Sequence, residues 1–314
     1  LKLMKPDYTK LLDDEILKFI QNTENFYSES DDFKKSIFEV RSSYNKMCEF
    51  FNKTKPYEVI SNDLLIKSTP IRHYKKASNN NKNGSVVYFH GGGFTLGGLE
   101  SHDSFCSEIC SLTSLQVFSV DYKLAPEYSP YQSLNECMEI IKWYEQSYSE
   151  PYVLAGDSAG GWIAANITHL MRHDLQFLNG QLLIYPALGG EETKGSYITH
   201  SDAPLLSTEW IISNRKKYFE ENNFIDDKYF PLKKNDFHNL PPTIVFVAEC
   251  DPLSDDGIIY VNKLKHHNNK AKCFIERGLV HSYIRAIHVS KKAKKSLHRI
   301  AKGLTSLSNS DWPY

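Results

Sequence analysis

The chain has 314 residues, 41% of them hydrophobic, which is enough for one large core or for one core with a small lid. Its 37 Lys and Arg residues nearly balance its 38 Asp and Glu residues. This balance gives no electrostatic reason to expect nucleic acid or an anionic membrane surface as a partner. No apolar run approaches the roughly 18 residues of a membrane span, and no apolar signal segment opens the chain.

Six cysteines in a chain of this length do not suggest a disulfide framework, and no Cys/His spacing matches a zinc site. We therefore expect no metal. Because free thiols persist in reducing compartments, a cytoplasmic location is the expectation.

The N-terminal region, 7–53, has apolar residues at helical spacing and is predicted to form helices. Two extended segments are expected next, at 57–60 and 64–74, followed by an Asn-rich turn at 78–84. From there, short apolar β-branched runs alternate with amphipathic segments, which is typical of a parallel sheet covered on both faces. The expected strands are 86–89, 116–120, 152–155, 182–185, 243–248 and 272–275, and the expected helices 103–112, 132–148, 161–173, 258–267 and 284–304.

The segment 189–239 interrupts this alternation. It is polar, carries one predicted helix near 208–221, and is too long for an ordinary connection between a strand and a helix. We interpret it as half of a lid whose other half is the N-terminal region. The predicted organisation is cap helices at 1–53, a first part of the core at 54–188, a cap insertion at 189–239 and a second part of the core at 240–314.

A glycine-flanked serine lies between a predicted strand and a predicted helix, in the pentapeptide Gly156-Asp157-Ser158-Ala159-Gly160. A serine at such a corner is forced into a tight turn that exposes its hydroxyl group. The two glycines stand where a Cβ atom would collide with the neighbouring strand or helix. The pattern alone is weak evidence for a nucleophile, so the rest of the chain must supply an oxyanion hole, a base and an acid.

A glycine run, His90-Gly91-Gly92-Gly93-Phe94, directly follows the predicted strand 86–89. Consecutive glycines let backbone N–H groups turn toward a ligand, as acyl transfer requires when charge builds on the carbonyl oxygen. A flexible turn or a phosphate-binding loop are the alternatives. A phosphate loop normally carries a lysine, which Thr95 to Gly98 lack. Paired with the serine pentapeptide, the run predicts the oxyanion hole of an esterase or lipase.

An acid and a base are expected after the serine, at the ends of later strands. Asp251 follows the predicted strand 243–248, where Glu249 and Asp255 are competitors and where Asp251 could instead cap the next helix. His281 follows the strand 273–276 and a predicted loop at 277–280. It is the histidine that combines the order Ser, Asp, His with a position after a strand.

Together these motifs, with Asp121 to Glu127 and Asp251-Pro252-Leu253, resemble the bacterial hormone-sensitive-lipase-like family of α/β-hydrolases, above all its cytoplasmic acetyl esterases. The resemblance implies an α/β-hydrolase fold, a mostly parallel central sheet flanked by helices, with a helical cap. It also implies cofactor-free hydrolysis of short-acyl esters. Carried over by position, Ser158 is the nucleophile, Asp251 the acid and His281 the base. The implied oxyanion donors are Ala159 and two of Gly91, Gly92 and Gly93, with Gly92 and Gly93 favoured.

The chain departs from this family at Ser282, where Gly or Ala usually follows the base, so its hydroxyl could lie near the substrate. The expected function is a serine carboxylesterase (EC 3.1.1 type) acting on short-chain, above all acetyl, esters. The expected partner is a small-molecule ester, with a homodimer left open. The alternatives are a catalytically silent ligand- or protein-binding module on the same scaffold and a peptidase. Because 1–53 and 189–239 are polar, an interfacially activated lipase is not expected.

Overall fold

The computed structural model describes residues 5–27, 36–78, 84–220 and 227–314. Of the predicted Asn-rich turn at 78–84, residues 79–83 lie outside the described residues. Within them, eight strands form one sheet in the order β1-β2-β4-β3-β5-β6-β7-β8. The first two strands are antiparallel to their neighbours and the other six run parallel. The strands are β1 Val59–Ile66, β2 Thr69–Lys76, β3 Ser85–Phe89, β4 Gln116–Val120, β5 Tyr152–Asp157, β6 Leu178–Ile184, β7 Thr243–Cys250 and β8 Ala271–Val280.

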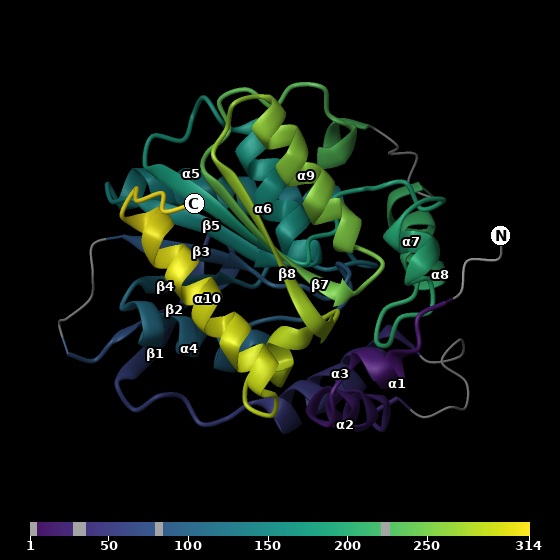
Figure 1. The fold of residues 1–314 in the computed structure, drawn as a ribbon. Helices are drawn as coiled ribbons and strands as arrows, with labels where there is room; N and C mark the ends of the chain where they lie inside the picture. Colours follow the sequence, from purple (N-terminus) through teal and green to yellow (C-terminus); the bar gives the residue numbers. More distant parts are fainter. Residues whose placement is uncertain (1–4, 28–35, 79–83, 221–226) are drawn as a thin grey trace.

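Helices cover both faces of this sheet, as the near-continuous apolar strands predict (Figure 1). Alternate side chains of β3 serve opposite cores: Val86 and Tyr88 belong to one cluster, and Val87 and Phe89 to the other. The first cluster includes residues of α4 (Asp103–Thr113) and α10 (Lys291–Ser308), and the second includes residues of α5 (Pro130–Ser147), α6 (Ala159–Leu170) and α9 (Ser254–His266). None of the helices in the described parts of the chain is long and apolar enough to cross a membrane.

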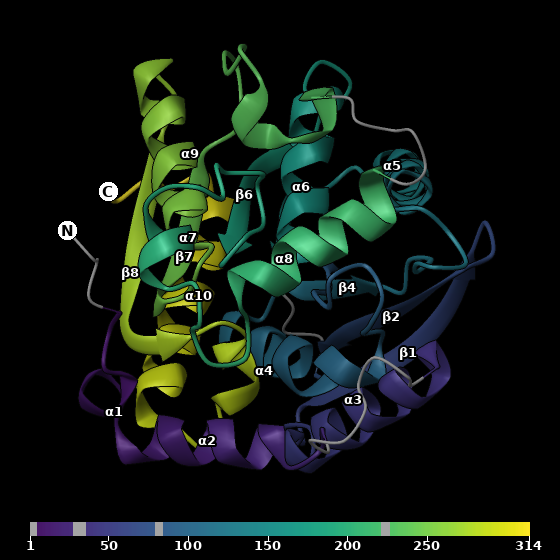
Figure 2. The same ribbon diagram turned by 90° about the vertical axis from the view of Figure 1, so that its right-hand side faces the viewer.

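The N-terminal helices and two helices of the 189–239 insertion, α7 (Ser196–Thr199) and α8 (Thr208–Arg215), lie at the same side of the sheet (Figures 1 and 2). Tyr8 Oη lies 3.1 Å from His200 Nδ1, and Lys5 forms an ion pair with Asp202. These contacts join the start of the chain to the insertion. The elements involved are α1 Tyr8–Leu11, α2 Asp14–Glu24, α3 Ile37–Phe51, α7 Ser196–Thr199 and α8 Thr208–Arg215, which continues as the π-helical turn η3 Lys216–Glu220, and the short turns η4 Asp227–Tyr229 and η5 Pro231–Lys233.

Several predicted boundaries are wrong. β6 begins at Leu178 instead of 182 and α9 at Ser254 instead of 258, and three further differences follow. The first strand runs through the polar residues 61–63, and the break falls instead at Lys67 and Ser68, which turn with positive φ angles without any glycine. The segment 277–280, predicted as a loop, belongs to β8, and Gly278 takes a φ of 64° inside it. The last helix starts at Lys291 rather than near 284, because Ser290 caps it, and a separate 3-10 turn, η6, spans Tyr283–Ala286.

Candidate active site

Ser158 occupies a sharp turn between β5 and α6. Its backbone has φ 53° and ψ −115°, a conformation that L residues rarely adopt. A Cβ atom on Gly160 would overlap the carbonyl oxygen of Phe89, and one on Gly156 would overlap the carbonyl oxygen of Gly160. The two glycines therefore allow α6 to approach the sheet closely enough to hold the strained serine.

The structure brings Ser158, His281 and Asp251 together. Ser158 Oγ lies 3.0 Å from His281 Nε2, and His281 Nδ1 lies 2.7 Å from Asp251 Oδ2. Asp251 is fully buried and His281 nearly so, while Ser158 is half-buried. Asp251 Oδ1 also accepts from the backbone N–H of Leu253 at 2.9 Å. This geometry allows the imidazole to take a proton from the serine while the carboxylate orients the ring.

The competing carboxylates have other partners. Glu249 Oε2 accepts from the backbone N–H of Gly278 at 2.7 Å, and Asp255 Oδ2 accepts from that of Ser196 at 2.8 Å. Because β7 and β8 are parallel neighbours, their carboxyl ends place Asp251 and His281 side by side. The extension of β8 to Val280 means that His281 follows the strand directly.

The glycine run turns sharply at the end of β3, and one of its predicted donors is not free. The N–H of Gly91 donates to Asp157 Oδ1 at 2.8 Å, so this donor already has a partner within the protein. Gly92 and Gly93 remain as candidates, with φ angles of 126° and 60°. Ala159 is the first residue of α6, so its N–H has no carbonyl partner within the helix and lies at the positive end of the helix dipole.

Asp157 forms a buried hydrogen-bond network that sequence reasoning missed. Besides Gly91, its carboxylate accepts from Tyr88 Oη at 2.7 Å and Tyr185 Oη at 3.3 Å, and His102 Nε2 lies 3.2 Å away. Burial alone would raise the pKa of Asp157, but His102, Tyr88 and Gly91 together hold it below its usual value. Asp157 is therefore an anion that joins the nucleophile turn to the glycine run. Only its position beside Ser158 marked it in the sequence.

His90 is held as a neutral, structural side chain. Burial and the neighbouring His102 lower its pKa to about 3. Its ring stacks on Tyr122 at 4.3 Å between centroids, and its Nδ1 lies 2.8 Å from the carbonyl oxygen of Gly91. Tyr122 Oη in turn donates to the carbonyl oxygen of His90 at 2.6 Å. Tyr122 thus braces the start of the glycine run.

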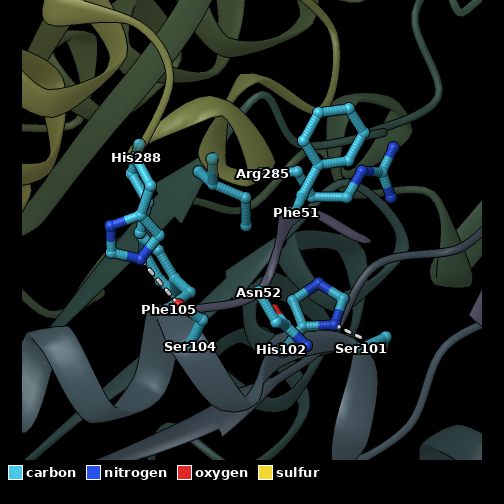
Figure 3. A pocket seen from close by; sticks show the side chains of 10 residues that line it. Phe51, Asn52, Ser101, His102, Ser104, Phe105, Arg285 and His288 are labelled. Atoms are coloured by element: carbon cyan, nitrogen blue, oxygen red, sulfur yellow. Dashed lines mark hydrogen bonds between the residues drawn. The ribbon is translucent and has the colours of Figure 1, made fainter. Parts of the chain in front are cut away.

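A small cavity lies beside His102, the partner of Asp157, between α3, the start of α4 and η6 (Figure 3). Two histidines are part of its lining. His102 Nδ1 lies 2.8 Å from Ser101 Oγ, and His288 Nε2 lies 2.7 Å from Ser104 Oγ, both within hydrogen-bond distance. The volume is about 10 Å³, roughly that of one water molecule. The cavity is therefore too small for an ester substrate.

The insertion covers the glycine run with aromatic side chains. A Cβ atom on Gly93 would collide with the ring edge of Trp210 on α8, so the indole lies directly against this glycine. Phe94 packs edge-on against Trp162 and Phe219, with centroids 5.1 and 5.3 Å apart. Trp210 is still 45% exposed, which leaves part of its ring accessible beside the site.

Among the described residues, no group of three or more His, Cys, Asp or Glu side chains could hold a metal ion. The arrangement of Ser158, His281 and Asp251 can perform acyl transfer by acid–base and nucleophilic chemistry.

Comparison with known proteins finds esterases that are similar to this chain. A protein family described as having the alpha/beta hydrolase fold matches residues 86–285. The carboxylesterase NlhH of Mycobacterium tuberculosis is 32% identical over 236 residues, covering 71% of this chain and 72% of its own. An arylesterase of Saccharolobus solfataricus is 28% identical over 310 residues, covering 93% and 99%. A hyperthermophilic esterase of Pyrobaculum calidifontis superposes with a TM-score of 0.83 at 27% identity, covering 95% and 99%.

The chain belongs to the α/β-hydrolase family. The predicted fold and the predicted likeness to esterases of this fold are confirmed.

Proposed function

We propose that this serine carboxylesterase hydrolyses short-chain, above all acetyl, esters through Ser158, His281 and Asp251. The observation that supports the proposal is the continuous chain of contacts from Ser158 Oγ to His281 Nε2 at 3.0 Å and from His281 Nδ1 to Asp251 Oδ2 at 2.7 Å. Each distance is within the reach of a hydrogen bond, and the nearly complete burial of the acid and the base keeps bulk water from competing for them.

In the first half of the reaction, Ser158 Oγ attacks the ester carbonyl carbon and its proton passes to His281 Nε2. The resulting tetrahedral intermediate collapses, the bond to the alcohol oxygen breaks, and His281 returns the proton to the leaving alcohol. Water then attacks the carbonyl carbon of the acyl-enzyme in the same way, and the carboxylic acid product leaves Ser158. Asp251 fixes the tautomer of His281 and stabilises the imidazolium that forms in each half.

The negative charge of the tetrahedral intermediate lies on the former carbonyl oxygen. We assign its donors as the backbone N–H groups of Gly92, Gly93 and Ala159. Donors fixed in advance stabilise this charge without reorganisation, and loss of one typically costs about 100- to 1,000-fold in kcat.

The acyl preference is assigned to a cap made of residues 1–53 and 189–239. Trp210 of this cap lies against Gly93, one of the proposed oxyanion donors. The departing alcohol must lie toward His281 to receive its proton, and we assign Trp210 to the other arm of the ester, the acyl group. A large rigid ring there leaves little room for a long chain, which favours acetyl and other short acyl groups.

The decisive experiment measures p-nitrophenyl esters from acetate to octanoate with wild-type protein and Ser158→Ala. The wild type should be fastest on the shortest esters, and Ser158→Ala should lose several orders of magnitude in kcat. Activity that survives in Ser158→Ala would refute the mechanism. An octanoate rate above the acetate rate would refute the short-acyl preference alone.

Replacement of Trp210 tests the origin of the preference. Trp210→Ala should raise kcat/KM for hexanoate and octanoate relative to acetate, whereas Trp210→Phe should stay close to wild type. Ile212→Ala is a matched control, since Ile212 is an exposed apolar residue on the same helix. An acyl profile unchanged in Trp210→Ala would show that another side chain limits the chain length.

A catalytically silent binding module is the alternative function. A fluorophosphonate probe separates the two, because it labels only an activated serine. Labelling that Ser158→Ala abolishes supports the esterase, and a wild-type protein inert to the probe supports the alternative.

We also propose a cytoplasmic location. All six cysteines are free thiols, five of them buried, which suits a reducing compartment. Immunodetection in fractionated cells tests this, and recovery of the protein outside the cytoplasmic fraction would contradict it.

A further inference from the structure

The glycine run holds an unusually strained backbone. Gly92, Gly93 and Phe94 are consecutive and all have positive φ angles, 126°, 60° and 64°. Glycine adopts such angles at little cost, but Phe94 has a Cβ atom and does not. A strained turn of this kind persists only where its surroundings hold it from several sides.

Contacts within the turn do not provide all of that restraint. The N–H groups of Thr95 and Leu96 both donate to the carbonyl oxygen of Gly92, at 3.1 and 2.9 Å. The two carbonyl groups that follow the glycines have partners from elsewhere. The N–H of Ala125 donates to the oxygen of Phe94 at 2.8 Å, and Arg41 Nε donates to that of Thr95 at 2.9 Å.

Arg41 connects these partners to one another. Its Nη2 donates to the carbonyl oxygen of Ala125 at 2.9 Å, and Nη1 and Nη2 bind the two oxygens of Glu127 at 2.8 and 2.7 Å. One guanidinium group therefore donates hydrogen bonds to both segments, to the carbonyl oxygen of Thr95 after the glycine run and to that of Ala125. Its side chain is only 23% exposed. The fixed fork of an arginine suits this task, and a lysine could not reproduce it.

The origin of Arg41 makes this contact informative. Arg41 lies on α3, in the N-terminal region, whereas the family match begins only at residue 86. The segment outside the matched part thus reaches the turn that carries two of the proposed oxyanion donors.

We propose that Arg41 is a positioning residue for the oxyanion hole: through Thr95 and Ala125 it holds the left-handed turn in the orientation that points the N–H groups of Gly92 and Gly93 at the developing oxyanion. The inference rests on the donors assigned above. Because the charge on the oxygen is full only in the tetrahedral intermediate, a misplaced donor lowers transition-state binding more than ground-state binding. The N-terminal region is accordingly part of the catalytic apparatus as well as a cover.

The experiment compares Arg41→Ala and Arg41→Lys with wild type on p-nitrophenyl acetate. Both should lower kcat about tenfold or more with little change in KM, because displacement of a reacting group by about 1 Å can cost 100-fold. Affinity for a trifluoromethyl ketone, which forms a tetrahedral adduct with the serine, should fall by the same factor as kcat/KM. A purely structural role would leave both quantities unchanged.

Arg172→Ala is the matched control. Arg172 also bridges a backbone carbonyl, that of His238 at 3.0 Å, and a carboxylate, that of Asp236. It follows the end of α6 that is remote from Ser158. Arg172→Ala should change the thermal midpoint about as much as Arg41→Ala does, but not kcat or ketone affinity.

Two outcomes would overturn the inference, and they differ. Gly93→Ala changes the donor turn directly, so an unchanged kcat in that variant would show that the proposed oxyanion hole itself is wrong. If Gly93→Ala loses activity while Arg41→Ala and Arg41→Lys keep wild-type kcat and ketone affinity, the oxyanion hole stands and the positioning role of Arg41 is wrong.

Discussion

Two turns meet at the active site, and they are held in different ways. The nucleophile turn, Gly156 to Gly160, lies between a strand and the helix that directly follows it. Its strain is confined to Ser158, and close packing of the adjacent elements fixes it. The glycine run, His90 to Phe94, has three consecutive left-handed residues. Asp157, Tyr122 and Ala125 bond to it, and Arg41 bonds to the adjoining Thr95, and all four are distant from it in the sequence.

The difference teaches where each part of the site is vulnerable. A turn fixed by packing fails when atoms are added to it. A turn fixed by hydrogen bonds from distant segments fails when a partner is removed, even one that never approaches the substrate. Substitutions in the nucleophile turn should therefore mainly lower the free energy of unfolding. Substitutions of the residues that hold the glycine run should also lower kcat.

The largest effect is expected for Gly160→Ala in the nucleophile turn. The added Cβ would overlap the Phe89 carbonyl oxygen, which is backbone in the centre of the sheet and has nowhere to move. We expect a loss of about 3 kcal/mol or more in the free energy of unfolding, measured by urea denaturation. Gly303→Ala is the control: its Cβ would meet only the side-chain methyls of Ile244 and Leu182, at 3.1 and 3.2 Å. Equal losses in both variants would contradict the packing argument.

Asp157→Asn removes the charge that joins the two turns. Its hydrogen bonds to Gly91, Tyr88 and His102 would lose their ionic character, at a cost of about 2 kcal/mol in the free energy of unfolding. Because Gly91 begins the glycine run, kcat on p-nitrophenyl acetate should also fall. Stability measured by urea and kcat measured in parallel check both parts. A variant that keeps wild-type kcat would show that the two turns are independent.

Asp256, on the helix that follows Asp251, is a third place where a buried side chain holds a distant segment. This fully buried carboxyl accepts from the backbone N–H groups of Leu188 at 2.7 Å and Gly190 at 3.4 Å, where the insertion begins, and burial raises its pKa to about 7. Between the unfolded pKa of about 4 and the folded pKa, the native state binds the extra proton. Stability should therefore fall as pH rises through this range and level off above it.

Asp256→Asn carries no titrating group and should show a flatter profile over the same range. Urea denaturation at pH 5, 6, 7 and 8 measures the two slopes. Parallel profiles for wild type and variant would mean that Asp256 does not titrate in this window.

The smallest effect is expected at the turn beside the base. Ser282 has a φ of 64°, and a non-glycine residue in this region costs about 1 kcal/mol. Ser282→Gly should raise the free energy of unfolding by about that amount without change in kcat. A lower kcat/KM in Ser282→Gly would instead support the expectation that its hydroxyl contacts the substrate.

Most of the fold was predictable because its signals are local. The alternation of apolar strands and amphipathic helices gave the parallel sheet, and β4 was predicted to the residue at Gln116–Val120. The boundary errors arose where tertiary pairing overrides local chemistry. Asn62 and Asp63 look like turn residues but pair with His73 and Arg72 in the β1–β2 hairpin. Gly278 looks like a loop residue but lies inside β8.

By itself, the sequence determined which residues could do chemistry and in what order, because the glycine-flanked serine, the glycine run and the strand-end Asp251 and His281 are short motifs with local geometry. The tertiary structure decided how they are held. Only the folded chain shows that Gly91 donates to Asp157 and so leaves Gly92 and Gly93 as candidates, and that Trp210 and Arg41 reach the same turn. Hydrogen bonds and contacts between residues 50 to 120 positions apart leave no periodic trace in a single sequence.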